Sequence, residues 1–208
     1  MARFIGPVCR LCRRSGDKLM LKGERCFGPK CGVDRRAKPP GPHMAQRRRM
    51  SDRGVQLREK QKAKYTYGLF ERQFRRFFSD AEKQVGITGD NLVVLLERRL
   101  DNVVYKLGYA DSRAQARQII LHGHILVKDH KMSIPSYMVN EGDTIKWREG
   151  SKKTEYYKIV LEGIKAKTVP NWLSLNRENL EGQVISLPSS DVIEAKFEPT
   201  SVVEWYSR

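Results

Sequence analysis

Residues 97–147 read ERRLDNVVYKLGYADSRAQARQIILHGHILVKDHKMSIPSYMVNEGDTIKW, and their local signals are the most consistent in the chain. Apolar residues recur three, four and seven positions apart over 92–107, which predicts one amphipathic helix that ends at Gly108. This spacing leaves Arg98 and Arg99 on the expected solvent face. The stretch therefore begins with a helix that has a basic outer side.

A second helix is predicted to begin after Ser112, because Gln115 stands at the capping-box distance from that hydroxyl. It extends to about Leu121. Arg113 and Arg117 lie four residues apart and are expected to share its solvent face, beside polar glutamines. The second helix is thus predicted to present a polar and basic surface.

Short extended runs follow the two helices, at 124–127, 132–134 and 144–147. Turn-type sequences, 128–131 and 140–143, separate them. Two helices against a small bent β-sheet are the expected unit.

The order of motifs in this stretch is specific. The pieces RLDNVVYKLG, SRAQARQ, HGHILV and IPSYMVNEGD occur in sequence and closely resemble the RNA-binding module named after small-subunit ribosomal protein four. The resemblance implies that the module binds RNA.

The charge of the chain also points to nucleic acid. The 208 residues carry 40 Lys and Arg against 24 Asp and Glu, a net charge of +16. Residues 1–76 hold 22 basic against 6 acidic side chains, so the whole excess lies in the first third. Such a field needs an anionic partner. No apolar run has membrane-spanning length and no secretory signal is recognisable, so we expect a cytosolic protein that binds no membrane.

The four cysteines lie in two close pairs, Cys9-x2-Cys12 and Cys26-x4-Cys31. Four thiolates at this spacing can complete the tetrahedral shell that zinc prefers, so one structural zinc ion is predicted. A 4Fe-4S cluster on the same cysteines is the alternative. Paired disulfides or unconnected thiols are less expected in a reducing cytosol.

The remaining sequence completes an α+β prediction: a metal-knuckle N-terminal arm, a small helical domain and an inserted module of two helices and a small bent sheet. A basic helix capped by Ser51 and a phenylalanine-rich helix over 70–85 make the helical domain. A helix is expected at 152–164, with strand-like pieces at 184–187 and 202–206. The predicted domains are 1–45, 46–96 with part of 150–208 packed on it, 97–160, and 161–208.

Similarity extends along the whole chain, through RFIGPVCRLCRR, LREKQK, WLSL and EWYSR. The chain resembles the bacterial small-subunit ribosomal protein four family, in its four-cysteine form. This implies a primary binder of small-subunit ribosomal RNA at a multi-helix junction, which nucleates assembly of the subunit body and contributes to translational accuracy. Implied partners are ribosomal proteins three, five and twelve, and messenger RNA near its path into the subunit. No small-molecule substrate is implied.

Charge and resemblance together select the candidate RNA contacts. They are Arg3, Arg10, Arg13, Arg14, Arg35, Arg36, Arg47, Arg48, Arg49, Arg53, Arg58, Lys60, Lys62, Arg72, Arg113, Gln115, Arg117, Gln118, His122 and His124. The candidate metal ligands are Cys9, Cys12, Cys26 and Cys31.

An enzyme is the rival class, since pseudouridine synthases carry the same module beside a large catalytic domain. Residues 149–208 are too short for such a domain, and no Gly-rich phosphate loop or nucleophile elbow is present. A small RNA chaperone would leave the cysteines and the last third unexplained. We therefore expect no catalytic residues.

Overall fold

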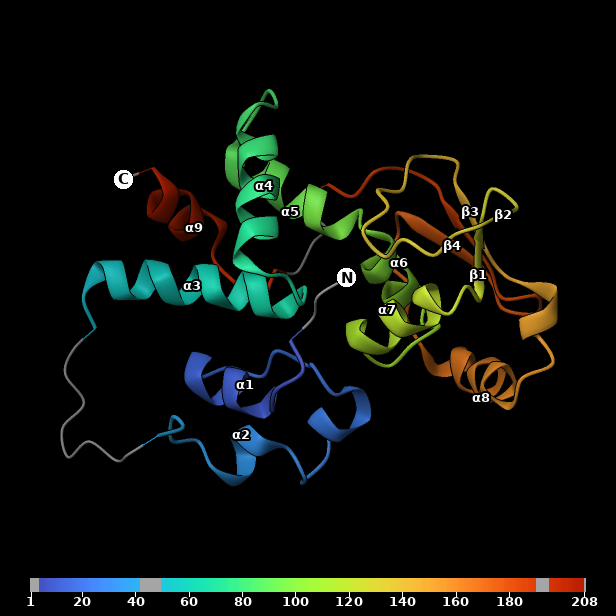
Figure 1. Ribbon diagram of the computed structural model, residues 1–208, viewed down its shortest axis with the longest axis horizontal. Helices are drawn as coiled ribbons and strands as arrows, with labels where there is room; N and C mark the ends of the chain where they lie inside the picture. Colours follow the sequence, from blue (N-terminus) through green and yellow to red (C-terminus); the bar gives the residue numbers. More distant parts are fainter. Residues whose placement is uncertain (1–3, 42–49, 190–194, 208) are drawn as a thin grey trace. The chain divides into compact units, whose positions relative to one another are not determined.

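The computed structural model describes residues 4–41, 50–189 and 195–207 (Figure 1). The chain forms two compact units, one of residues Met1–Val93 with Ile193–Arg208 and one of residues Val94–Val192. The first is helical and the second combines helices with a small antiparallel sheet, so the predicted α+β class is confirmed. Residues 161–208 contribute to both units.

The N-terminal arm contains short helices that frame the cysteines. They are α1 (Cys9–Ser15), the 3-10 turn η1 (Gly23–Cys26) and α2 (Gly32–Arg35). Leu19, between α1 and η1, is fully buried. The arm has few other buried apolar residues, as its composition indicated.

The helical part of the first unit is built on α3 (Asp52–Thr66). Its predicted cap is confirmed, because the Ser51 side chain accepts a hydrogen bond from the Gly54 N–H at 3.3 Å. The C-terminal helix α9 (Pro199–Tyr206) packs along it. The strand expected at 202–206 was wrong: the Val-rich sequence favours a strand locally, but Pro199 opens a helix whose side chains pack on α3.

Helix α4 (Glu71–Glu82) carries the predicted aromatic face of the same unit. Phe74 and Phe78 are buried, and the ring of Tyr206 stacks on Phe78 with 4.5 Å between centroids. The expected apolar stripe does not reach Val85, which is fully exposed because the helix has already ended.

The single helix expected over 92–107 is two helices, α5 (Thr88–Glu97) and α6 (Leu100–Lys106). The helix is interrupted at Arg98 and Arg99 because the backbone pairs there with a distant segment. The Val139 N–H donates to the Arg98 carbonyl at 2.9 Å, and Arg99 forms a β-bridge with Met138. The break turns Arg99 inward, and its side chain is only 1% exposed. The expectation that Arg99 faces solvent was therefore wrong.

Helix α7 (Arg113–Leu121) follows with its predicted cap. The Ser112 hydroxyl accepts from the Gln115 N–H at 3.3 Å, and the Gln115 side chain accepts from the Asp111 N–H at 2.9 Å. The return bond of the capping box thus goes to Asp111, one residue before the cap.

The sheet of the second unit contains five antiparallel strands among the described residues, in the order β2-β1-β3-β5-β4. The strands are β1 (Ile125–Val127), β2 (His130–Lys131), β3 (Thr144–Trp147), β4 (Leu173–Asn176) and β5 (Glu181–Val184). The first and third predicted runs are confirmed. The strand expected at 132–134 is absent from this described segment, because the partner of β1 begins directly after a two-residue turn at Lys128 and Asp129, both at positive φ. The strand expected at 184–187 ends instead at Val184.

Helix α8 (Glu155–Gly163), with flanking 3-10 turns η2 (Glu149–Ser151) and η3 (Ile164–Ala166), completes the unit. The buried core joins α6, α7 and the sheet, and its largest side chains are Trp147 and Trp172. Within the described residues, no helix is long and apolar enough to cross a lipid bilayer.

Candidate nucleic-acid interface and cysteine cluster

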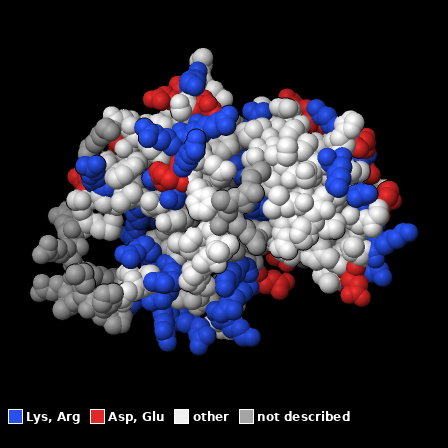
Figure 2. Space-filling model, viewed as in Figure 1, with Lys and Arg blue, Asp and Glu red and all other residues white. Residues whose placement is uncertain are grey.

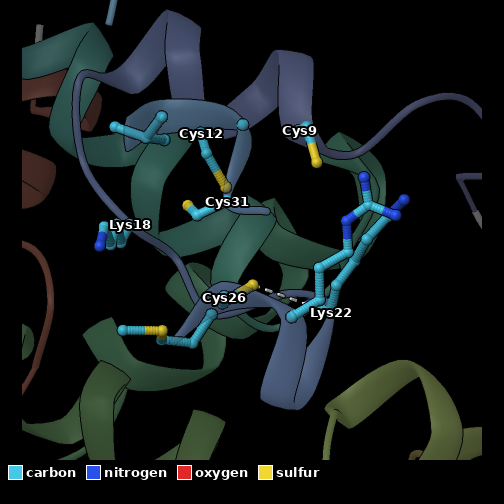
Figure 3. Close-up of a pocket in the computed structure, with 10 residues that line it drawn as sticks. Cys9, Cys12, Lys18, Lys22, Cys26 and Cys31 are labelled. Atoms are coloured by element: carbon cyan, nitrogen blue, oxygen red, sulfur yellow. Dashed lines mark hydrogen bonds between the residues drawn. The ribbon is translucent and has the colours of Figure 1, made fainter. Parts of the chain in front are cut away.

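The four cysteines line one small cavity in the arm, with a volume of about 20 Å³. Figure 3 shows their side chains turned toward this common space from three elements. Cys9 and Cys12 lie one turn apart on α1, Cys26 ends η1 and Cys31 caps α2. All four are free thiols, so the disulfide alternative has no support in the structure.

Close packing and charge shape this cavity. A β-carbon on Gly32 would lie 3.0 Å from Cys9 Cβ and 3.4 Å from Cys9 Sγ, so glycine allows α2 to approach α1. The Lys22 N–H donates to Cys26 Sγ at 3.4 Å. Burial raises the pKa of the Cys12 thiol, and the nearby Cys26, Cys9 and Cys31 raise it further. Thiols that repel one another as anions are a donor set that a cation would stabilise.

The four thiols do not form a complete metal-coordination shell. Among the residues that the structure describes, no three His, Cys, Asp or Glu side chains are arranged closely enough to hold a metal ion. The metal prediction therefore rests on the donor set and its common cavity.

A basic hollow of about 730 Å³ lies beside the cysteines in the same arm. Arg13, one of its lining residues, links α1 to the segment after α2, because its Nε donates to the carbonyls of Arg36 at 3.0 Å and Lys38 at 2.9 Å. No acidic side chain belongs to its described lining, which is Arg10, Arg13, Arg35, Arg36, Ala37, Lys38, Pro40 and Gly41. The hollow thus brings together four predicted RNA contacts. Arg14 is exposed but lies outside it.

Other predicted contacts in this region fall outside the described residues. They are Arg3, Arg47, Arg48 and Arg49.

Helix α3 differs from the expected solvent-exposed basic face. Lys60 is only 4% exposed, forms an ion pair with Glu71 and lies over the rings of Trp205 and Tyr206. The expectation of an accessible Lys60 was wrong, because α9 and the start of α4 cover it.

The other cations of α3 are also engaged within the protein. Lys62 Nζ lies 2.6 Å from an Asp17 carboxylate oxygen and 2.7 Å from a Glu59 oxygen. Burial lowers the pKa of Lys62, but these two carboxylates raise it more, and the net shift is upward. Arg58 donates to Met50 Sδ at 3.8 Å, while Arg53 is exposed and stacks over Trp205 at 5.5 Å.

The polar face of α7 is narrower than its sequence indicated. Arg117 is only 8% exposed, and its Nη1 lies 3.1 Å from Asp101 Oδ2. Asp101 also accepts two bonds from Arg99, at 3.1 and 2.8 Å. The prediction that Arg117 lies on the solvent face was wrong, because Asp101 on α6 draws it into a buried ion network.

Arg113 is half-buried. Its Nε donates to Asn102 Oδ1 at 2.8 Å, and its guanidinium lies 4.7 Å from the centre of the Tyr105 ring. Gln118 is exposed on α7, whereas Gln115 is partly buried at the cap. The structure thus leaves Gln118 as the most accessible of the predicted α7 contacts.

His122 and His124 lie on either side of Gly123, with 5.9 Å between ring centres. His122 is exposed. His124 Nδ1 is 2.8 Å from Ser151 Oγ, and burial, with smaller effects of His122 and Arg148, lowers the pKa of its imidazole. His124 is thus held in the unit, and His122 is the freer of the two.

Two family models match consecutive parts of the chain. The "Ribosomal protein S4/S9 N-terminal domain" covers residues 3–97, and the "S4 domain" covers residues 98–145. Proteins named small ribosomal subunit protein uS4 match from end to end. The protein of Dehalococcoides mccartyi is 58% identical and that of Halothermothrix orenii 53% identical, each over all 208 residues and the full length of both chains. The chain belongs to the uS4 family.

Membership in the uS4 family confirms the resemblance on which the sequence analysis relied. The relatives carry the name of a ribosomal protein and not of an enzyme, and a uS4A protein of Clostridium novyi matches equally along its full length, at 53% identity. The pseudouridine synthase alternative therefore has no support.

Sequence reasoning missed one group of cations in this uS4 family member. Arg75 and Arg76 on α4, and Lys83 at its C-terminal cap, are exposed beside the predicted Arg72. The buried stripe formed by Phe74 and Phe78 was the signal that could have placed them on the opposite side of the helix.

Lys and Arg are unevenly spread over the face of the molecule shown in Figure 2. They gather over α4 and over the arm with α1 and α2, while the surface of the sheet-containing unit carries basic and acidic groups in a mixture. On this face, the exposed positive charge thus lies mainly on the first unit.

Proposed function

We propose that this protein is a structural constituent of the small ribosomal subunit in the cytoplasm and binds its ribosomal RNA. The observation that carries the proposal is the end-to-end identity of 58% with a small ribosomal subunit protein uS4. The basic hollow in the arm and the S4 domain at 98–145 are the chemistry that this role needs. The role requires no catalytic group.

Recognition proceeds through shape and phosphate. The deep major groove of A-form RNA hides base edges from side chains, so a protein of this size reads the arrangement of backbones at a folded junction. Arg10, Arg35 and Arg36 line a hollow without carboxylates, where guanidinium forks suit phosphate oxygens. In the second unit, the exposed side chains of Gln118 and His122 offer polar groups for contact with RNA. These contacts help to orient the protein on the RNA.

The test is binding to small-subunit ribosomal RNA transcribed from the genome that encodes this protein, with a non-ribosomal RNA of equal length as control. Specific binding should be at least about 1000-fold tighter than binding to the control, by analogy with specific and non-specific nucleic-acid complexes. Hydroxyl-radical footprinting should protect one junction. Equal affinity for both RNAs would refute the proposal.

We propose further that Cys9, Cys12, Cys26 and Cys31 hold one structural zinc ion. Four thiols that line one cavity supply the tetrahedral donor set that zinc prefers, and a 4Fe-4S cluster on the same thiols is the alternative. Four thiolates would fill the tetrahedral shell, so zinc would supply folding free energy and no catalysis. Elemental analysis of protein purified without oxygen decides between zinc and iron, and absence of both would refute a metal centre.

The family role also suggests finer partners. We propose contacts with small-subunit ribosomal proteins three, five and twelve, a position near the path by which messenger RNA enters, a role in nucleating the subunit body and a contribution to translational accuracy. Order-of-addition reconstitution tests nucleation: omission of this protein should prevent later body proteins from joining. Normal assembly without it would refute that part.

A further inference from the structure

Helix α4 has a basic outer face, which consists of Arg72, Arg75, Arg76 and Lys83 and is called the α4 outer face below. All four side chains are exposed. The first and last of these residues are eleven residues apart, which is about 16 Å at the rise of an α-helix. Phe74 and Phe78 anchor the other side of the helix in the core. A rigid helix therefore presents a line of cations long enough to follow several consecutive phosphates.

The cations of this face are available, unlike those of α3. The side chains of Arg72, Arg75 and Lys83 form no hydrogen bond or ion pair in the described ranges. Arg76 has one distant pair, with 3.9 Å between its Nε and Asp80 Oδ2. Exposed pairs of this kind contribute little.

One acidic neighbour, Glu71, is already paired within the protein, whereas Asp80 and Glu82 of α4 are exposed. Glu71 pairs with Lys60, lies 3.1 Å from Lys64 Nζ and accepts a bond from the Tyr206 hydroxyl at 2.9 Å. Burial raises the pKa of Glu71, but the bonds from Lys60, Tyr206 and Lys64 lower it more, so the net shift is downward. The negative charge of Glu71 therefore neutralises lysines of α3 and not the cations of the α4 outer face.

The shape and composition of the surface decide the class of partner. The face borders a shallow groove of about 800 Å³, whose lining contains only charged residues and Ser79. A stable protein partner would need apolar or aromatic anchor positions, and no apolar side chain belongs to the described lining. Guanidinium and ammonium groups in a groove suit a phosphodiester backbone.

We propose that the α4 outer face is a second RNA-backbone site, distinct from the hollow in the arm, which binds phosphates of the same ribosomal RNA. This inference rests on the proposed function. It assigns the phosphate contacts of the helical part to α4, while α3 acts as the internal support to which the arm and α9 attach.

The test replaces three cations by residues that keep the helix: Arg72→Gln, Arg75→Gln and Lys83→Gln together. A matched control removes the same charge from the second unit, at Lys153, Lys158 and Lys165, which are also exposed. Circular dichroism and thermal unfolding check that both variants fold. Affinity for the small-subunit ribosomal RNA is measured against salt concentration, with footprinting of the bound RNA.

The α4 variant should lose about 10- to 100-fold in affinity at 0.1 M salt, and the log–log salt slope should fall by about 2, because each lost phosphate contact removes about 0.7 to 0.9. One backbone segment should lose its footprint, while the control variant keeps the wild-type values. Wild-type affinity and footprint for the α4 variant would overturn this site but leave the proposed function intact.

Other outcomes are equally decisive. Equal losses of RNA affinity in both variants would show that the effect comes from net charge alone, which would overturn the site. Wild-type RNA binding combined with failure to join a reconstituted subunit would assign the face to an acidic protein and also overturn it. If the wild-type protein does not prefer ribosomal RNA, the proposed function itself fails.

Discussion

Replacing Asp101 by Ala should destabilise the second unit strongly. Its side chain is 6% exposed, and the carboxylate accepts two bonds from Arg99, of 3.1 and 2.8 Å, and one from Arg117 at 3.1 Å. Removal leaves two buried guanidinium groups without their shared counter-charge. Breaking a buried ion pair in this way costs about 3 to 5 kcal/mol. At about 4 °C or more per kcal/mol, the melting temperature should fall by at least about 12 °C.

Urea unfolding followed by tryptophan fluorescence measures this loss, since Trp147 and Trp172 are buried in the same unit. Asp129→Asn is the matched control, because this carboxylate is 77% exposed and lies 3.5 Å from Lys146 Nζ, and asparagine tolerates the positive φ of this position. It should cost less than about 1 kcal/mol. If Asp101→Ala also costs less than about 1 kcal/mol, the buried network does not stabilise the unit as argued.

The same network predicts the behaviour of Arg117. Arg117→Met should lower stability by about 1.5 to 3 kcal/mol, the range for a hydrogen bond to a charged group. It should leave the salt dependence of RNA affinity unchanged, because the side chain is only 10% exposed. A salt slope lower by about 0.7 to 0.9 would show instead that Arg117 contacts phosphate.

Three further predictions concern the metal, pH and packing. Chelation should make residues 4–41 sensitive to protease while the unfolding midpoint of the second unit stays constant; an unchanged digestion pattern would contradict a metal-held arm. Burial places the folded pKa of His124 below the unfolded value of 6.5, so its contribution to stability is present above pH 6.5 and is lost as pH falls through the folded pKa. His124→Gln should flatten this acid-side loss in thermal melts, and a melt with the wild-type pH dependence would exclude His124 as its source. Gly182→Ala should cost about 1 to 3 kcal/mol by overpacking, because the new methyl would lie 2.5 Å from Cδ1 of fully buried Leu107; unchanged stability in urea would show that Leu107 can move aside.

Local sequence signals predicted much of the module. The hydroxyl of Ser112 caps α7 and the apolar pattern of residues 144–147 forms β3, because both features depend on neighbours in the chain. The break at Arg98 was not visible, since it depends on hydrogen bonds from residues some forty positions away. Periodicity shows which residues are apolar. It does not show which distant backbone N–H group will hydrogen-bond to a carbonyl and interrupt the helix.

Charges were harder to place than apolar residues. Lys60 and Arg117 look like solvent-facing cations in the sequence, but Glu71 and Asp101 hold them inside. The two partners of each ion pair are far apart in the sequence or lie on different helices. Counting the charges along one helix therefore cannot identify the pair. The α4 outer face escaped notice for the converse reason: the carboxylate of Glu71, at the start of α4, pairs with Lys60 and Lys64 of α3 and not with the cations of that face.

The C-terminal segment shows how tertiary packing overrides propensity. Residues 202–206 contain two valines and two aromatic residues, which favour a strand. In the structure Val202 is buried and Gln56 Nε2 of α3 donates to Glu204 Oε2 at 2.7 Å, so the segment gains more as a helix along α3. The cysteine cavity, by contrast, followed directly from the spacing of its thiols, whereas the arginine hollow beside it depends on where α1 and α2 meet.

The pairing of β3 with β5 limits how the RNA-binding part can be isolated. The S4 domain match ends at residue 145, inside β3, yet Thr144 and Ile145 pair with Gln183 and Gly182. A fragment cut at that boundary would expose an unpaired strand edge, which favours aggregation. A fragment of residues 94–192 keeps both partners of every sheet pair. Evolution can therefore move this module between proteins only if the new host supplies a strand, or another cover, for the same edge.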